Sequence, residues 1–107
     1  MPSQRRLAAI MFSDIAGYTA MMRRNESDGM IRVKRYRQVL SDSIAAHGGQ
    51  LLQHYGDGSL CIFDSAVEAV ACASAIQLQL QQPPEVPLRI GIHLGDIVVE
   101  EEDIFGD

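Results

Sequence analysis

The chain has 107 residues, 47% hydrophobic and 21% charged, which indicates one globular domain with a modest core rather than a disordered segment. Its formal net charge is −5, yet eight of its nine basic residues precede residue 38, and few aromatic residues accompany them, so nucleic acid is not expected as a partner. No apolar run approaches the roughly 20 residues that span a membrane. The apolar run after the basic N-terminus is too short for a signal peptide, so a cytoplasmic location is expected.

The first half of the chain predicts one strand and two helices. A continuous apolar run at 7–12 is typical of a central buried strand, and Gly17 allows a tight turn after it. A short helix is expected over 19–24. A longer helix is expected from an N-cap at Ser27 to about residue 47, where Gly48 and Gly49 end it. Its apolar stripe at helical spacing consists of Val33, Tyr36, Leu40, Ile44 and His47.

The second half predicts a hairpin, a helix and two further strands. Strands are expected over 50–55 and 59–63, with a turn at Gly56-Asp57-Gly58. Ser65 is expected to cap a helix over 66–81, which the prolines after it end. Strands over 88–94 and 97–100 are expected on either side of a turn at Gly95-Asp96. The order of elements predicts an α+β fold: a ferredoxin-like split βαβ sheet with the helices on one face.

Two groups of residues have competing interpretations. Cys61 and Cys72 lie in apolar contexts without CxxC spacing, so reduced core thiols are favoured over a disulfide. The three histidines lack metal-site spacing with these cysteines, so zinc is not expected. A basic cluster on the long helix is either a solvated face or a source of attraction for an anionic ligand or an acidic partner surface. That cluster consists of Arg32, Lys34, Arg35 and Arg37.

Asp14 and Asp57 are the candidate metal ligands, because each places a carboxylate at the end of an apolar strand. In a split βαβ core the end of the first strand and the tip of the central hairpin are neighbours, so the two carboxylates are expected to converge on divalent cations. Backbone amides around 16–19 open a helix and can bind phosphate oxygens. Taken singly, Asp14 is also compatible with a helix N-cap, and Asp57 with an ordinary turn residue.

Four motifs in this order resemble those of class III nucleotidyl cyclase catalytic domains. The resemblance covers nearly the whole chain, and it implies the nucleotide cyclase catalytic fold. The motifs are Phe12-Ser13-Asp14-Ile15-Ala16-Gly17-Tyr18-Thr19, Gln53-His54-Tyr55-Gly56-Asp57-Gly58-Ser59-Leu60, Arg89-Ile90-Gly91-Ile92-His93-Leu94-Gly95 and Asp103-Ile104-Phe105-Gly106-Asp107.

The resemblance implies a role for each matching residue. Asp14 and Asp57 would bind two Mg²⁺ or Mn²⁺ ions per site, with the Ile15 carbonyl as a further ligand. Base recognition would fall to Asp103, which can accept a hydrogen bond from the adenine amino group, and to Gln53, where many adenylyl cyclases carry a lysine. The phosphate-binding backbone would be that of Gly17, Tyr18 and Thr19. Asp96 stands where some relatives have a phosphate-contacting arginine, so that contact is not expected.

The implied activity is conversion of ATP to cyclic AMP and pyrophosphate. The implied assembly is a homodimer with its active sites at the interface, where one subunit supplies Asp14 and Asp57 and the other supplies Gln53 and Asp103. The family's transition-state asparagine and arginine come after the last motif. Residues 1–107 are therefore expected to be a partial catalytic domain, inactive alone, with a regulatory domain fused in the parent protein.

Three alternatives accompany this interpretation. Gln53 and the absent transition-state residues favour a degenerate nucleotide-binding or dimerisation module, although such a module need not keep both aspartates. The glutamine also leaves a guanylate cyclase open. A diguanylate cyclase shares the metal chemistry, but the chain has no GGDEF turn.

Overall fold

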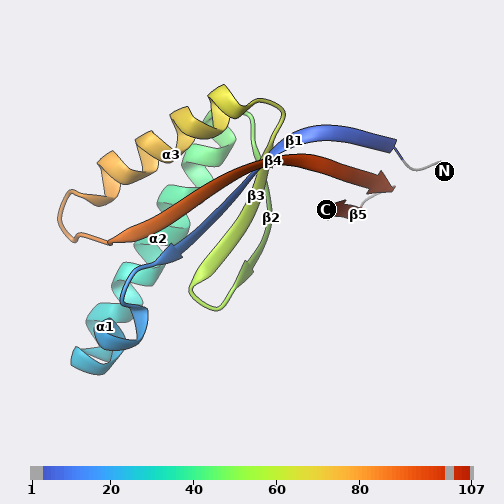
Figure 1. The fold of residues 1–107 in the computed structure, drawn as a ribbon. Coiled ribbons are helices and arrows are strands. Elements are labelled where there is room, and N and C mark those ends of the chain that lie inside the picture. The colour runs from blue at the N-terminus through green and yellow to red at the C-terminus, as the bar shows by residue number, and fades with distance from the viewer. Residues whose placement is uncertain (1–3, 101–102, 107) are drawn as a thin grey trace.

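The structure is a computed structural model that describes residues 4–100 and 103–106. Its elements are β1 (Gln4–Ile15), α1 (Tyr18–Arg24), α2 (Glu26–Ala46), β2 (Gln50–Tyr55), β3 (Gly58–Phe63), α3 (Ala66–Leu80), β4 (Leu88–Glu100) and β5 (Asp103–Gly106). The strands form one antiparallel sheet in the order β2-β3-β1-β4-β5 (Figure 1). The first four strands have the order of a split βαβ sheet, which confirms the predicted fold class.

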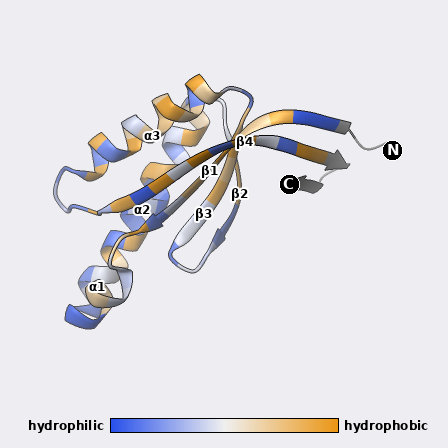
Figure 2. Ribbon diagram, viewed as in Figure 1, coloured by the Kyte–Doolittle hydropathy of each residue, from blue (hydrophilic) through white to orange (hydrophobic). Residues whose placement is uncertain are grey.

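Helices α2 and α3 cover one face of the sheet, as predicted (Figure 1). Alternate residues of a strand point to opposite faces, so Met11 and Ile15 of β1 lie under the helices, in one buried cluster with Leu40 of α2 and Ile76 of α3. Figure 2 shows hydrophobic residues on α3 and on the central strands. A smaller cluster occupies the other face of the sheet and consists of Ala8, Ile10, Ile62 and Ile97.

The helix ends follow local capping chemistry. The predicted N-cap Ser27 is wrong, because Asn25 caps α2: its side-chain oxygen accepts a hydrogen bond from the Asp28 amide over 2.9 Å. Ser65 caps α3 as predicted, and its hydroxyl accepts two backbone amides. Gly48 follows α2 with φ of 70°, a left-handed conformation that glycine adopts without strain. None of the described helices combines the length and apolar character that a bilayer crossing requires.

Strand β4 is longer than predicted, and the predicted turn at Gly95-Asp96 is wrong. Both residues lie inside β4, opposite Ala8 and Leu7 of β1. Since β1 begins at residue 4 rather than 7, it offers β4 a continuous row of backbone partners, and no turn is needed. The paired strands extend beyond the helices (Figure 1), which leaves Leu7 62% exposed.

Three of the four basic side chains of the α2 cluster donate hydrogen bonds to backbone carbonyls of other segments, which neither sequence interpretation predicted. Arg32 pairs with an aspartate one turn earlier and donates to a backbone carbonyl in the loop before β4. Arg35 donates to the carbonyls of Gln79 and Gln82, at the end of α3 and just after it. Arg37 reaches a carbonyl of the β2–β3 turn over 3.5 Å. Lys34 is exposed, as a solvated face requires.

Cys61 and Cys72 are free and buried in the main core, which confirms the prediction of reduced core residues. Burial disfavours the thiolate, so it raises the pKa of Cys61 to about 12 and that of Cys72 to about 11.

Both thiols of the folded chain should therefore resist Ellman's reagent at about pH 8, and both should react once the chain is unfolded in guanidinium chloride. An unfolded thiol has a pKa of 9.0, below both folded values, so the unfolded chain loses these protons first. The two thiols should therefore not change the free energy of unfolding below pH 9. Above pH 9 they should lower it, as the pH rises toward the folded pKa values of about 11 and 12. Rapid labelling of the native chain would contradict this burial.

Replacing Gly49 with alanine should destabilise the fold, because the new methyl group would overlap the ring of the buried Phe63. Overpacking of this kind costs about 1–3 kcal/mol of the free energy of unfolding, measurable by urea denaturation. Gly91→Ala is the matched control, since a methyl group there meets no atom within 4 Å. Equal stability of the two variants would show that Gly49 and Phe63 do not pack in this way.

Candidate functional site

Asp14 and Asp57 lie together where the end of β1 meets the tip of the β2–β3 hairpin. The Ile15 amide donates to the backbone carbonyl of Asp57 over 3.2 Å, and Asp14 pairs with Gly58 across the β1–β3 ladder. Both aspartates are partly accessible to solvent. The N-cap of α1 is Gly17, without a side-chain capping bond, so Asp14 is not the helix cap that the sequence left open.

The hairpin approaches β1 closely because residue 58 is glycine. A Cβ atom at Gly58 would lie 3.0 Å from the carbonyl oxygen of Ser13 and 3.5 Å from the Cβ of Asp14. The preceding Gly56 has φ of 57°, which closes the tight turn that contains Asp57. Two glycines thus bring the second aspartate up to the first.

Arg89 of β4 binds the Asp14 carboxylate with two parallel hydrogen bonds. Its Nε donates to Oδ1 over 2.8 Å, and its second terminal nitrogen donates to Oδ2 over 3.1 Å. The two residues are direct partners in the β1–β4 register. The hydrogen bond and the charge of Asp14 raise the pKa of the Arg89 guanidinium, and the charge of Asp57 adds to this. Arg89 therefore responds to both carboxylates.

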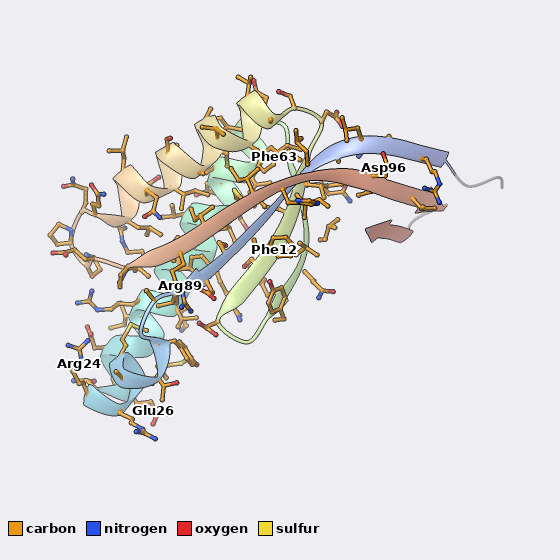
Figure 3. All side chains as sticks on the ribbon, in the orientation of Figure 1. Phe12, Arg24, Glu26, Phe63, Arg89 and Asp96 are labelled. Atoms are coloured by element: carbon orange, nitrogen blue, oxygen red, sulfur yellow. The ribbon has the colours of Figure 1, made fainter. Side chains whose placement is uncertain are left out.

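The sheet face opposite the helices carries Gln53 and two exposed aromatic residues. Phe12 and Tyr55 are 44% and 46% exposed on it, and Gln53 pairs with Leu60 in the neighbouring strand and is exposed. Figure 3 shows Phe12 and Arg89 on this part of the sheet. A shallow pocket of about 250 Å³ lies here, and its lining includes Phe12, Asp14, Tyr55, Arg89 and Gly91. The predicted Gln53 thus lies on the same face as Asp14, one cross-strand row away.

A buried hydrogen-bond network lies behind the two aspartates. The hydroxyl of Tyr36, from α2, bonds the hydroxyl of Ser13 at 2.7 Å and that of Ser59 at 2.9 Å. His54 Nδ1 contacts the same Ser59 hydroxyl at 2.8 Å. Ser13 precedes Asp14 on β1, and Ser59 on β3 lies two residues after Asp57, so Tyr36 joins the two strands next to which the carboxylates lie. Burial raises the pKa of Tyr36, so the hydroxyl stays protonated as a donor.

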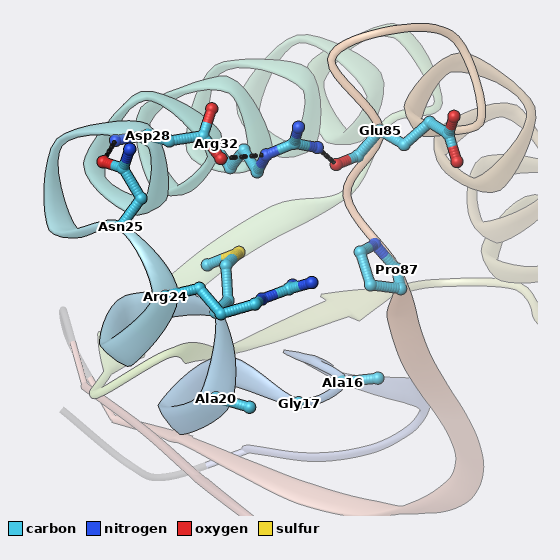
Figure 4. Close-up of a pocket in the computed structure, with 10 residues that line it drawn as sticks. Ala16, Gly17, Ala20, Arg24, Asn25, Asp28, Arg32, Glu85 and Pro87 are labelled. Carbon is cyan, nitrogen blue, oxygen red and sulfur yellow. Dashed lines mark hydrogen bonds and ion pairs between the residues drawn. The ribbon is translucent and has the colours of Figure 1, made fainter.

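The predicted phosphate-binding residues follow directly after Ile15. Gly17 adopts φ of 70° and ψ of 29°, and Tyr18 and Thr19 begin α1. The amide of Ala16 donates to the carbonyl of Pro87 over 2.8 Å, which anchors this turn to the start of β4. A larger cavity, of about 760 Å³, lies between this turn, the start of α2 and the loop before β4 (Figure 4). Neither aspartate lines this cavity, whereas Asp14 lines the pocket on the sheet face, so we assign the candidate site to that face.

The donor set at the aspartates fits a hard divalent cation, because carboxylate and carbonyl oxygens are its preferred ligands. The described residues contain no group of three or more histidine, cysteine, aspartate or glutamate side chains arranged to hold a metal. Two carboxylates suit an ion such as Mg²⁺ that takes further ligands from substrate phosphates and water. The backbone of Asp103 begins β5, whereas its side chain lies outside the described part of the chain.

Sequence reasoning missed Arg89 and Tyr36 as site residues. Arg89 is the one basic residue after residue 37, in a segment that is otherwise acidic, and this isolation was the available signal. Tyr36 was assigned to the apolar stripe of the long helix, and its hydroxyl gave no separate signal. Its partners come from distant strands, so only the folded chain shows their contact.

No protein-family model matches the chain. The crystal structure of an adenylate/guanylate cyclase/hydrolase from Silicibacter pomeroyi is similar with a TM-score of 0.82 and 45% sequence identity, over 99% of this chain and 66% of that one. The fold is therefore that of a nucleotide cyclase catalytic domain.

Two curated relatives extend the comparison. The chain is 41% identical over 112 residues to "Putative adenylate cyclase 3" of Rhizobium meliloti (strain 1021), a match that covers 97% of this chain and 19% of that protein. It is 33% identical to an adenylate cyclase of Streptomyces coelicolor, over 95% of this chain and 27% of that protein. The chain belongs to the class III adenylyl/guanylyl cyclase catalytic domains. It spans less than a third of the length of these two relatives.

Removing the Tyr36 hydroxyl should destabilise the fold, because Tyr36→Phe leaves the buried hydroxyls of Ser13 and Ser59 without a shared partner. We expect a loss of about 1–3 kcal/mol in the free energy of unfolding, measured by urea denaturation. Tyr55→Phe is the control: its side chain is 46% exposed, and its loss should cost at most about 0.5 kcal/mol. A neutral Tyr36→Phe variant would mean that the network contributes nothing to stability.

Proposed function

We propose that this chain is part of a nucleotidyl cyclase catalytic domain that converts ATP to cyclic AMP and pyrophosphate. The observation that carries the proposal is the contact between the end of β1 and the β2–β3 turn, where the Ile15 amide donates to the Asp57 carbonyl and Asp14 pairs with Gly58. Membership of the class III cyclases and the adenylate cyclase names of the two curated relatives support it.

Asp14 and Asp57 would hold divalent Mg²⁺ or Mn²⁺ ions, together with the backbone carbonyl of Ile15. Such ions, when bound, would activate the ribose 3′-hydroxyl for attack on the α-phosphate and would neutralise the leaving pyrophosphate. The backbone amides of Gly17, Tyr18 and Thr19 would bind phosphate oxygens, since amides at the start of a helix are free to donate. The anchoring of the preceding turn to β4 would hold these donors in position.

Base recognition would come from a second subunit in a homodimer. Gln53 is exposed on the open face, where a partner can reach it, and its amide can both donate and accept hydrogen bonds. Asp103 would accept the adenine amino hydrogen, whereas guanine presents a carbonyl at that position. The preference for ATP over GTP rests on Asp103 alone in this scheme, because Gln53 suits either base.

Cyclic nucleotide formation by the whole protein that contains these residues tests the proposal. The assay supplies ATP or GTP with Mg²⁺ or Mn²⁺, and it compares wild type with Asp57→Asn. The variant should lose activity by about 100-fold or more, the scale on which removal of one preorganised electrostatic group acts. Asp42→Asn is the matched control, since it removes the same charge from an exposed position on α2 and should change activity by less than about twofold.

Equal turnover by wild type and Asp57→Asn would refute the metal-binding role of Asp57. A faster reaction with GTP than with ATP would show that the protein is a guanylate cyclase rather than an adenylate cyclase. No cyclic product in any condition would favour the alternative of a nucleotide-binding or dimerisation module.

A further inference from the structure

The Asp14 carboxylate has both of its oxygens engaged by one guanidinium. Arg89 donates to Oδ1 over 2.8 Å and to Oδ2 over 3.1 Å, the two-point geometry by which arginine binds a carboxylate most strongly. A compact divalent cation needs at least one of the same oxygens, at a distance of about 2.0–2.1 Å for Mg²⁺. The guanidinium and the ion therefore require the same atoms of Asp14.

The Arg89 side chain can move away from Asp14 without disturbing the core. Its side chain is 70% exposed and that of Asp14 is 39% exposed, and both lie on the face opposite the helices. The residue carries a full positive charge next to two carboxylates, so it offsets part of the negative charge that would attract a cation. Both effects oppose binding of a metal ion at Asp14.

We propose that Arg89 is an internal, displaceable competitor for the metal-binding carboxylate of Asp14, and that it lowers the affinity of the site for free divalent ions. This inference rests on the metal-binding role of Asp14 in the proposed function. Arg89 is then a positioning residue of the site, since it holds Asp14 in a neutralised pair while no cation competes for it. Its effect appears in metal affinity itself, independently of turnover.

Binding of Mn²⁺ to the whole protein, measured without nucleotide from the electron paramagnetic resonance signal of the free ion, tests the proposal. Arg89→Gln should bind Mn²⁺ about threefold to fivefold more tightly than wild type, the ratio expected when one exposed ion pair no longer opposes binding. Arg89→Lys keeps the charge and loses the two-point contact, so its affinity should lie between the two. Circular dichroism spectra establish that each variant is folded.

Two controls separate the contact from a general change of charge. Arg6→Gln removes the same charge and an exposed ion pair with Asp64 at 3.2 Å, and its Mn²⁺ affinity should stay within about twofold of wild type. In an Asp14→Asn background, Arg89→Gln should produce a smaller change than in wild type, because the shared carboxylate is gone and only the charge of Arg89 near Asp57 still opposes the ion.

Equal or weaker Mn²⁺ binding by folded Arg89→Gln would overturn the proposal, and weaker binding would show that Arg89 instead assists the ion by orienting Asp14. That result would leave the proposed function standing. Absence of Mn²⁺ binding in wild type and in every variant would refute the metal role of Asp14 and with it the competition, which is a distinguishable failure.

Discussion

Strand β1 is hydrogen-bonded along both of its edges, and its register determines both the core and the candidate site. Asp14 faces Gly58 on one side and Arg89 on the other. Because side chains alternate along a strand, a shift of one residue would turn Asp14 toward the helices and Met11 toward solvent. Such a shift is unfavourable because it would expose core residues of β1 to water, so burial on the helix side of the sheet also keeps the Asp14 carboxylate on the opposite face.

The Tyr36 network adds a polar constraint to this apolar one. Tyr36 reaches from α2 through the core to the two serines, which lie on β1 and β3 beside the aspartate-bearing ends of those strands. A satisfied buried network disfavours alternative packings, since any slip would leave a hydroxyl unpaired in a low-dielectric interior. The helix layer thereby takes part in fixing the distance between β1 and the hairpin.

The sequence predicted the strand order, the glycine stop after α2, the Ser65 cap and the meeting of Asp14 with the hairpin, because these depend on local signals and on one simple topology. It failed at Ser27 and at Gly95-Asp96. In the first case Asn25 serves two helices at once, and in the second the length of β1 overrides the turn preference of a glycine. Arg89 and Tyr36 act through partners 75 and 23 residues away, so no local pattern could reveal their contacts. The roles of Gly17, Tyr18, Thr19, Gln53 and Asp103 stay predictions.

Gly58 allows the β2–β3 hairpin to approach β1 closely next to Asp14. A Cβ atom at this position would lie 3.0 Å from the Ser13 carbonyl oxygen, closer than ordinary packing, so the hairpin or β1 would have to shift by a few tenths of an ångström. In a diverged copy of this chain, the residue at position 58 is thus an indicator, visible in the sequence alone, of how closely the turn that carries Asp57 can approach β1.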